Sequence, residues 1–176
     1  KAKNDDKIKG IYFDVAVVPA GMATTQEIRN ALLDFKESGK WIVSYNEIYT
    51  QKALYLSSVA DEIYIYPEGF MEFRGLNAEV TFFKNLLDDL QIEPQIIRGS
   101  NNKFKSAVEP FILDEMSQAS RMQTKKWLES MWGSMLDGMS DSYTISAEKL
   151  NEIAENYSIQ IASDAVDAGM ATAVMY

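Results

Sequence analysis

The sequence contains no histidine and no cysteine, and these two absences exclude several classes of catalytic site. Without histidine the chain cannot form a Ser-His-Asp triad or use an imidazole as a general base. Without cysteine it has no thiol nucleophile, no disulfide and no Cys/His zinc site. Any chemistry performed by this chain must therefore use carboxylates, lysine, serine, threonine or tyrosine.

Basic residues are also scarce, since 17 of them stand against 26 acidic ones and the net charge is −9. Nucleic-acid binding usually needs a basic surface, so no nucleic-acid partner is expected. Phosphate-binding glycine loops and EF-hand loops are missing as well, and we expect neither a cofactor nor a metal. The sequence contains no run of about 18 apolar residues, so no membrane span is predicted. Because the chain starts at Lys1 without a Met, we expect it to be part of a longer protein.

What is present fits one α/β domain of 176 residues. Short apolar runs alternate with segments of helical periodicity, a pattern typical of a mostly parallel sheet with flanking helices. Thr24 and Glu27 form a capping-box pattern, Ser117 and Ser146 are expected N-caps, and Gly169 is an expected helix stop. The predicted strands are 8–15, 41–45, 63–66 (closed by Pro67-Glu68-Gly69), 94–98 and 171–175, with helices at 24–38, 50–60, 78–90, 117–139, from 146, and from 163, and a polar loop at 99–102.

Lys105 is the one lysine whose surroundings suggest chemistry. It follows a polar loop and precedes a short helical start that Pro110 limits. A lysine can act as a general base, or activate a serine, once burial favours its neutral form. From the residues alone, the simpler interpretation is an exposed lysine loosely paired with Glu109.

A family resemblance favours the catalytic interpretation. The segment from Lys105 to Phe111, with Asp114 to Ser117 following it, resembles the lysine segment of signal peptide peptidases of the protease IV type. Other segments resemble the same family in the same order, so that the resemblance covers roughly residues 8 to 175. These segments are 31–40, 58–64, 67–69, 75–79, 82–88 and 165–170.

The resemblance implies a crotonase-like (ClpP/crotonase) fold and a place in a two-domain Ser/Lys serine endopeptidase. Long members of the family are tandem duplications, in which the N-terminal domain supplies the base lysine and the C-terminal domain the serine nucleophile. Lys105 stands at the position of the base, so residues 1–176 resemble a single N-terminal domain. The implied partners are the serine-bearing domain, further copies of the protein and a cleaved signal peptide as substrate. The implied location is the bacterial cell envelope, through a membrane anchor outside these residues.

No nucleophile is expected in this chain. Where the serine-bearing repeat has a Ser-Gly-Gly-Tyr motif after the second strand, Gln51, Lys52 and Ala53 stand here. Lys52 does not favour the close backbone approach that an oxyanion hole requires, so we expect the isolated chain to be inactive. Ser106 is interpreted mainly as a helix-start cap. No catalytic role is assigned to Ser44, Ser57 or Ser58.

Two alternatives stay open. The chain could be a non-catalytic crotonase-like domain that forms oligomers or binds peptides, and a crotonase-type acyl-CoA enzyme is a further reading by fold analogy alone.

The long predicted helix carries a wide apolar stripe that core packing explains most simply. We hypothesise that part of this stripe contacts another domain or protomer. Its members are Trp127, Leu128, Met131, Trp132, Met135, Leu136 and Met139.

Overall fold

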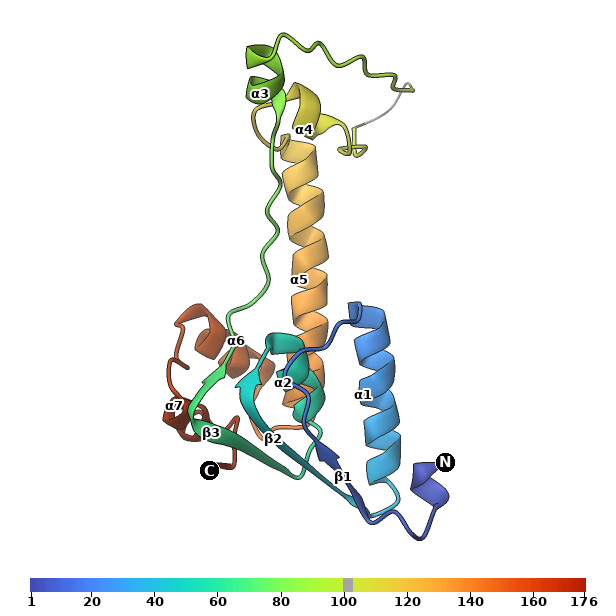
Figure 1. The fold of residues 1–176 in the computed structure, drawn as a ribbon, viewed down its shortest axis with the longest axis vertical. Helices are drawn as coiled ribbons and strands as arrows, with labels where there is room; N and C mark the ends of the chain where they lie inside the picture. The colour runs from blue at the N-terminus through green and yellow to red at the C-terminus, as the bar shows by residue number, and fades with distance from the viewer. Residues whose placement is uncertain (100–102) are drawn as a thin grey trace. The chain divides into compact units, whose positions relative to one another are not determined.

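The structure is an α/β fold, as the sequence predicts. A computed structural model describes residues 1–99 and 103–176, so most of the loop predicted at 99–102 lies outside the described residues. Four parallel strands form one sheet in the order β1-β2-β3-β4 (Figure 1). The strands are β1 (Gly10–Phe13), β2 (Trp41–Tyr49), β3 (Glu62–Met71) and β4 (Ala173–Val174). The helices are the 3-10 turn η1 (Ala2–Asn4), α1 (Met22–Lys36), α2 (Gln51–Ser57), α3 (Lys84–Asp89), α4 (Glu109–Ile112), α5 (Gln118–Ser140), α6 (Ala147–Glu155) and α7 (Ala162–Asp167).

The described residues divide into two compact units. The first unit comprises residues 1–75 and 133–176 and contains the sheet. The second unit comprises residues 76–132 and contains α3, α4 and the first part of α5. The prediction of a single domain for 1–176 is not decided by this division, since α5 runs through both units.

One face of the sheet is covered by α1 and α2. Leu32 and Phe35 of α1 pack with Ile42 of β2 and Val59, and a neighbouring cluster joins Ala53 and Leu56 of α2 to Val18. Strand side chains alternate between the two faces, so the covered row also contains Ile11, Phe13 and Ile63. This burial of apolar surface is the main stabilising contribution to the first unit.

The third strand does not end at Pro67-Glu68-Gly69 as predicted. Pairing with β2 skips from Asn46↔Ile65 to Ile48↔Phe70, so these residues form an irregularity inside a longer strand. A Cβ at Gly69 would lie 2.6 Å from the Glu47 carbonyl oxygen, which explains why glycine is needed there. The irregularity lets the strand resume beyond a proline that cannot donate to the ladder.

Other predicted boundaries were wrong for local reasons. The helix α1 begins at Met22 with Gly21 as its N-cap, because buried Thr25 bonds back to the Gly21 carbonyl and the Thr24 capping box does not form. No strand occurs at 94–98, where Ile97 is 99% exposed. A strand needs a partner, and this segment has none among the described residues. The helix predicted at 78–90 is limited to α3, while the last predicted strand is confirmed as the short β4.

The predicted caps of two later helices are confirmed. The Ser117 hydroxyl accepts the backbone N–H of Ser120 at 3.2 Å, and the Ser146 hydroxyl accepts that of Lys149 at 3.2 Å. The last helix, α7, begins one residue before the predicted Ser163. It is followed by Gly169 at φ 73, which is the left-handed stop that the sequence predicts.

A buried arginine joins three helices of the first unit. Arg29 on α1 is 1% exposed, and its guanidinium donates to the Tyr55 carbonyl at 2.6 Å and to the Gly138 carbonyl. It also donates to the hydroxyls of Ser58 and Ser142, at 2.8 and 2.6 Å. The two carbonyls belong to the last turns of α2 and α5, where the helix dipole favours positive charge. Burial lowers the pKa of Arg29 from its ordinary value, but a guanidinium remains charged.

Candidate functional site

Lys105 lies in the second unit, in a turn region before α4, and its side chain is exposed. The sequence-based alternative of a pair with Glu109 does not form, because the Glu109 carboxylate is used elsewhere. It accepts the Ser117 hydroxyl at 2.7 Å and the Ser117 backbone N–H at 3.2 Å. Within the described residues Lys105 forms no ion pair, so its amine is available to a partner.

The Lys105 segment is held by contacts with α3 and α5. Buried Glu109 connects the segment to the start of α5 through Ser117. The backbone N–H of Phe83 donates to the Pro110 carbonyl at 2.7 Å, and the Phe83 and Phe111 rings stack at 6.0 Å. These contacts place segment 82–88 beside segment 105–111, two of the segments that carry the family resemblance.

Ser106 does not cap α4 with its side chain. The helix begins after Val108, and no side-chain cap bond is formed there. The backbone carbonyl of Ser106 instead accepts the N–H of Glu109 at 2.9 Å. Its role in this structure is therefore to shape the turn between Lys105 and α4.

Gln51 occupies the first position of α2, two residues after the end of β2. Its side chain makes three hydrogen bonds to the backbone of Arg74 and Gly75, and we call this set of bonds the Gln51 bracket. Its side-chain oxygen accepts the backbone N–H groups of Arg74 and Gly75 at 3.0 and 3.1 Å, and its side-chain nitrogen donates to the Gly75 carbonyl at 2.9 Å. These three bonds fix the chain that leaves β3. The side chain at the expected serine position is thus occupied by structural contacts and carries no nucleophile.

Lys52 and Thr50 also make structural contacts around the start of α2. The Lys52 amine donates to the Ala20 carbonyl at 2.7 Å, in the loop before α1. The Thr50 hydroxyl donates to the Ala16 carbonyl at 2.7 Å. The long Lys52 side chain therefore reaches the loop before α1 and is engaged in a structural contact there.

The remaining serines considered from the sequence are buried and structural. Ser44 bonds to the Phe13 carbonyl, the Tyr49 hydroxyl and the Ser57 hydroxyl, at 3.1, 2.9 and 3.0 Å. Ser58 belongs to the Arg29 network. None of these three serines has a lysine amine as hydrogen-bond partner.

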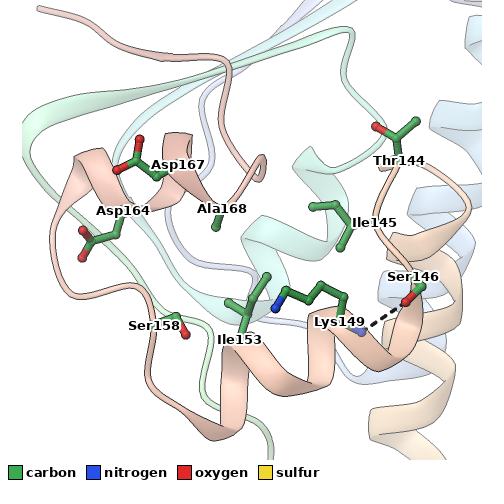
Figure 2. A pocket seen from close by; sticks show the side chains of 9 residues that line it. All are labelled: Thr144, Ile145, Ser146, Lys149, Ile153, Ser158, Asp164, Asp167 and Ala168. Carbon is green, nitrogen blue, oxygen red and sulfur yellow. Dashed lines mark hydrogen bonds between the residues drawn. The ribbon is translucent and has the colours of Figure 1, made fainter.

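A pocket of about 510 Å³ lies between α6 and α7 in the first unit. Figure 2 shows Lys149 on one side of it and Asp164 and Asp167 on the other. The Asp164 carboxylate accepts two backbone N–H groups at the start of α7, at 2.8 and 3.0 Å, and these bonds lower its pKa. Lys149 pairs with Glu152 at 3.0 Å. Most charged groups of this pocket therefore have structural partners, and the pocket shows no catalytic arrangement.

Neither a metal centre nor a membrane span is found in the described part of the chain. No group of three or more acidic residues could hold a metal ion there. No helix among the described residues has the length and apolar character needed to cross a bilayer.

The sequence profile of peptidase family S49 matches residues 34–176 of this chain. The chain belongs to peptidase family S49. The S49 fold is ClpP/crotonase-like, which confirms the predicted fold class together with the parallel sheet. The predicted resemblance to protease IV-type signal peptide peptidases is confirmed as well.

Named S49 relatives come from bacteria and from a plant. The chain is 35% identical over 162 residues to Protease 4 of Haemophilus influenzae, covering 89% of this chain and 25% of that protein. It is 34% identical over 151 residues to Protease 4 of Salmonella typhi, covering 85% and 24%. It is 31% identical over 157 residues to the chloroplastic serine protease SPPA of Arabidopsis thaliana, covering 89% and 22%. The chain thus spans about a quarter of the length of these curated relatives.

The hydrogen bonds of the Gln51 bracket are expected to contribute to the free energy of unfolding. Replacing Gln51 by alanine leaves the N–H groups of Arg74 and Gly75 without their acceptor, so we expect a loss of about 1–3 kcal/mol in the free energy of unfolding. Urea denaturation measures this loss. The control is Gln51→Glu, which keeps an acceptor oxygen and should lose less. Equal stability of the alanine variant and the parent chain would show that the bracket contributes nothing.

Proposed function

We propose that this chain is the lysine-donating domain of a Ser/Lys signal peptide peptidase. The proposal rests on the difference between Lys105, at the position of the base, and Gln51, at the expected position of the serine. Lys105 is present, exposed and unpaired within the described residues, whereas the expected serine position holds the Gln51 bracket. A chain with a base and no nucleophile needs a second domain to supply the serine.

The chemistry would be acyl transfer. The neutral Lys105 amine takes the proton from the serine hydroxyl of the partner domain as the serine oxygen bonds to the peptide carbonyl carbon. The C–N bond then breaks, and the leaving amine receives a proton from the ammonium. The same lysine next takes a proton from water, whose oxygen bonds to the acyl carbon. The ester C–O bond then breaks, the serine oxygen regains a proton from the ammonium, and the acid is released. Coverage of the exposed Lys105 by the serine-bearing domain would favour its neutral form.

The second unit supports the need for a partner. Between residues 76 and 132, the buried residues that the structure describes are Glu109 and Ser120, both polar. Large apolar side chains in the same range are exposed, in contrast to what stable monomers usually show. These are Val80, Phe83, Leu86, Leu90, Ile92, Ile97, Phe104, Phe111, Met122 and Trp127. We infer that the serine-bearing domain and further copies of the protein cover this apolar set.

The apolar stripe of α5 divides in a way that supports the same inference. Met135, Leu136 and Met139 are buried in the first unit, as core packing predicts. Trp127, in the second unit, is 57% exposed. Part of the stripe therefore belongs to the core, and part is available to a partner.

We expect the chain to associate with itself in solution. Analytical ultracentrifugation over a range of concentrations should show dimers or larger species, because the exposed apolar set favours burial. Trp127→Glu should shift the distribution toward monomer, while Val17→Glu, a matched change at an exposed apolar residue of the first unit, should not. A chain that stays monomeric at every concentration would contradict the homo-oligomer part of the proposal.

The assignment itself is tested by separating the two halves. Hydrolysis of a signal-peptide substrate should be absent from the isolated chain and present when the chain is joined to a serine-bearing S49 domain. Activity of the joined protein should depend on Lys105. Turnover by the isolated chain would show that it contains a nucleophile of its own, which would contradict the proposal.

A non-catalytic role in oligomer formation or peptide binding is the second candidate. It is favoured by the structural use of Gln51 and Lys52 at the start of α2. The two candidates differ at Lys105, since only the catalytic one requires that side chain. For either candidate we propose a location at the bacterial cell envelope, with an anchor outside these residues. Fractionation of cells that express the full-length protein tests that location.

A further inference from the structure

The face of the sheet opposite α1 and α2 carries a group of tyrosines. The alternation of strand side chains puts Tyr12, Tyr45 and Tyr64 on this face, and Tyr45 and Tyr64 are register partners. Tyr66 follows on the same side of β3, and its ring contacts that of Tyr176 edge-on at 5.6 Å. Tyr12 is 58% exposed. The face is thus aromatic, with Tyr12 exposed and Tyr45, Tyr64 and Tyr66 half-buried, whereas both faces of a parallel sheet are usually covered.

A hollow of about 290 Å³ opens on this face at the carboxyl ends of β1 and β2. Its lining residues include two tyrosines, Tyr12 and Tyr45, and two acidic residues, Asp14 and Glu47, whose charges act on Tyr45. No lysine or arginine lines it. Ligands of parallel α/β sheets commonly bind at the carboxyl ends of strands.

The negative charge of the hollow is not neutralised by the described chain. Neither Asp14 nor Glu47 takes part in an ion pair or side-chain hydrogen bond there, unlike Lys149 and Asp164 of the α6–α7 pocket. Desolvation, together with the nearby Glu47 and Asp14 carboxylates and two tyrosines, raises the pKa of Tyr45. No positive group opposes that shift. The described residues contain no acidic group of three that would favour a metal ion instead.

We propose that this hollow binds a lysine or arginine side chain of an extended peptide. The two carboxylates match the charge of the bound side chain, and the tyrosine rings match its apolar stem and support cation–π contact. Arginine fits better than lysine, because its planar guanidinium can stack on a ring and bond to a carboxylate at once.

A guanidinium or ammonium on a flexible apolar stem is the chemistry of an arginine or lysine side chain, so a peptide is the source of this cation. The hollow adjoins the start of α2, because the carbonyl of Ala16, which lines the hollow, accepts a hydrogen bond from the Thr50 hydroxyl at 2.7 Å. The inference rests on the proposed function only in identifying the bound peptide as a substrate of the peptidase. The charge and ring complementarity come from the chain itself.

The test measures binding of uncleaved peptides to the full chain by fluorescence anisotropy. The probe is an end-blocked, fluorescein-labelled glycine-serine peptide with one central arginine, compared with the same peptide carrying glutamine. The arginine peptide should bind more tightly, and its advantage should shrink at high salt. The double change Asp14→Asn and Glu47→Gln should raise its Kd about 10-fold or more while leaving the glutamine peptide unaffected.

Two further variants keep the test decisive. Tyr12→Leu removes one ring at an exposed position and should weaken arginine binding while the carboxylates remain. Asp167→Asn makes a matched charge change in the α6–α7 pocket and should leave binding within about 2-fold. Equal binding of the arginine and glutamine peptides, or an equal effect of Asp167→Asn, would overturn the site. Because no hydrolysis is measured, such a failure is distinguishable from a failure of the Lys105 assignment.

Discussion

Replacing Lys105 by alanine in the protein that joins this chain to a serine-bearing domain should lower kcat/KM for peptide hydrolysis by about 10²- to 10⁴-fold. The alanine variant has no group at that position to take the serine proton, so the nucleophile stays a weakly reactive hydroxyl. Folding should be unaffected, since the Lys105 side chain is exposed and the segment is held by Glu109 and Phe83. Steady-state kinetics and circular dichroism measure the two effects.

Two matched variants separate the role of the base from that of charge. Lys105→Arg keeps the positive charge but cannot lose its proton, so it should be as inactive as the alanine variant. Lys103→Ala removes an exposed lysine two residues away and should retain activity within about 3-fold. Substantial turnover by Lys105→Ala would rule out Lys105 as the general base.

Replacing Arg29 by methionine should lower the free energy of unfolding by about 3 kcal/mol or more. Methionine retains much of the side-chain length, so the loss comes chiefly from the polar groups that the guanidinium leaves behind. The Gly138 carbonyl and the Ser142 hydroxyl lose a buried charged donor, whereas the Tyr55 carbonyl keeps a bond from Ser58 at 2.9 Å. Urea denaturation followed by tryptophan fluorescence measures the change.

Arg29→Lys and Arg121→Met are the controls for this prediction. Lysine keeps the charge but cannot reach both helix ends with a planar fork, so we expect an intermediate loss. Arg121 is exposed, and its replacement by methionine should change stability by no more than about 0.5 kcal/mol. A loss below about 1 kcal/mol for Arg29→Met would mean that the network is not a main support of the fold.

The elements that sequence periodicity predicted well are those in which a local signal coincides with an available packing partner, whether near in the chain or distant, as for β4 on β3. The strands β1, β2 and β3, and the helices capped by Ser117 and Ser146, form near their predicted positions because local signals and burial agree. The strand predicted at 94–98 failed because its apolar run has no neighbour to pair with in the described chain. Periodicity cannot supply a partner.

The candidate site was predicted unevenly for a similar reason. Family resemblance predicts Lys105 as the base and no serine at position 51, and both stay predictions. It could not predict the use of Gln51 as a bracket, which depends on where β3 ends. The Tyr12, Asp14, Tyr45 and Glu47 hollow was also missed. Its signal was present as a tyrosine followed two residues later by an acid, once at β1 and its end and once in β2, yet only the register shows that they meet.

The bracket at the start of α2 bears on whether this chain could acquire a serine nucleophile at position 51. A serine introduced at position 51 is too short to reach the N–H groups of both Arg74 and Gly75, and Lys52 would still lie over the Ala20 loop. A change of Gln51 to serine alone should therefore lose stability, because the hydrogen bonds of the Gln51 side chain are lost.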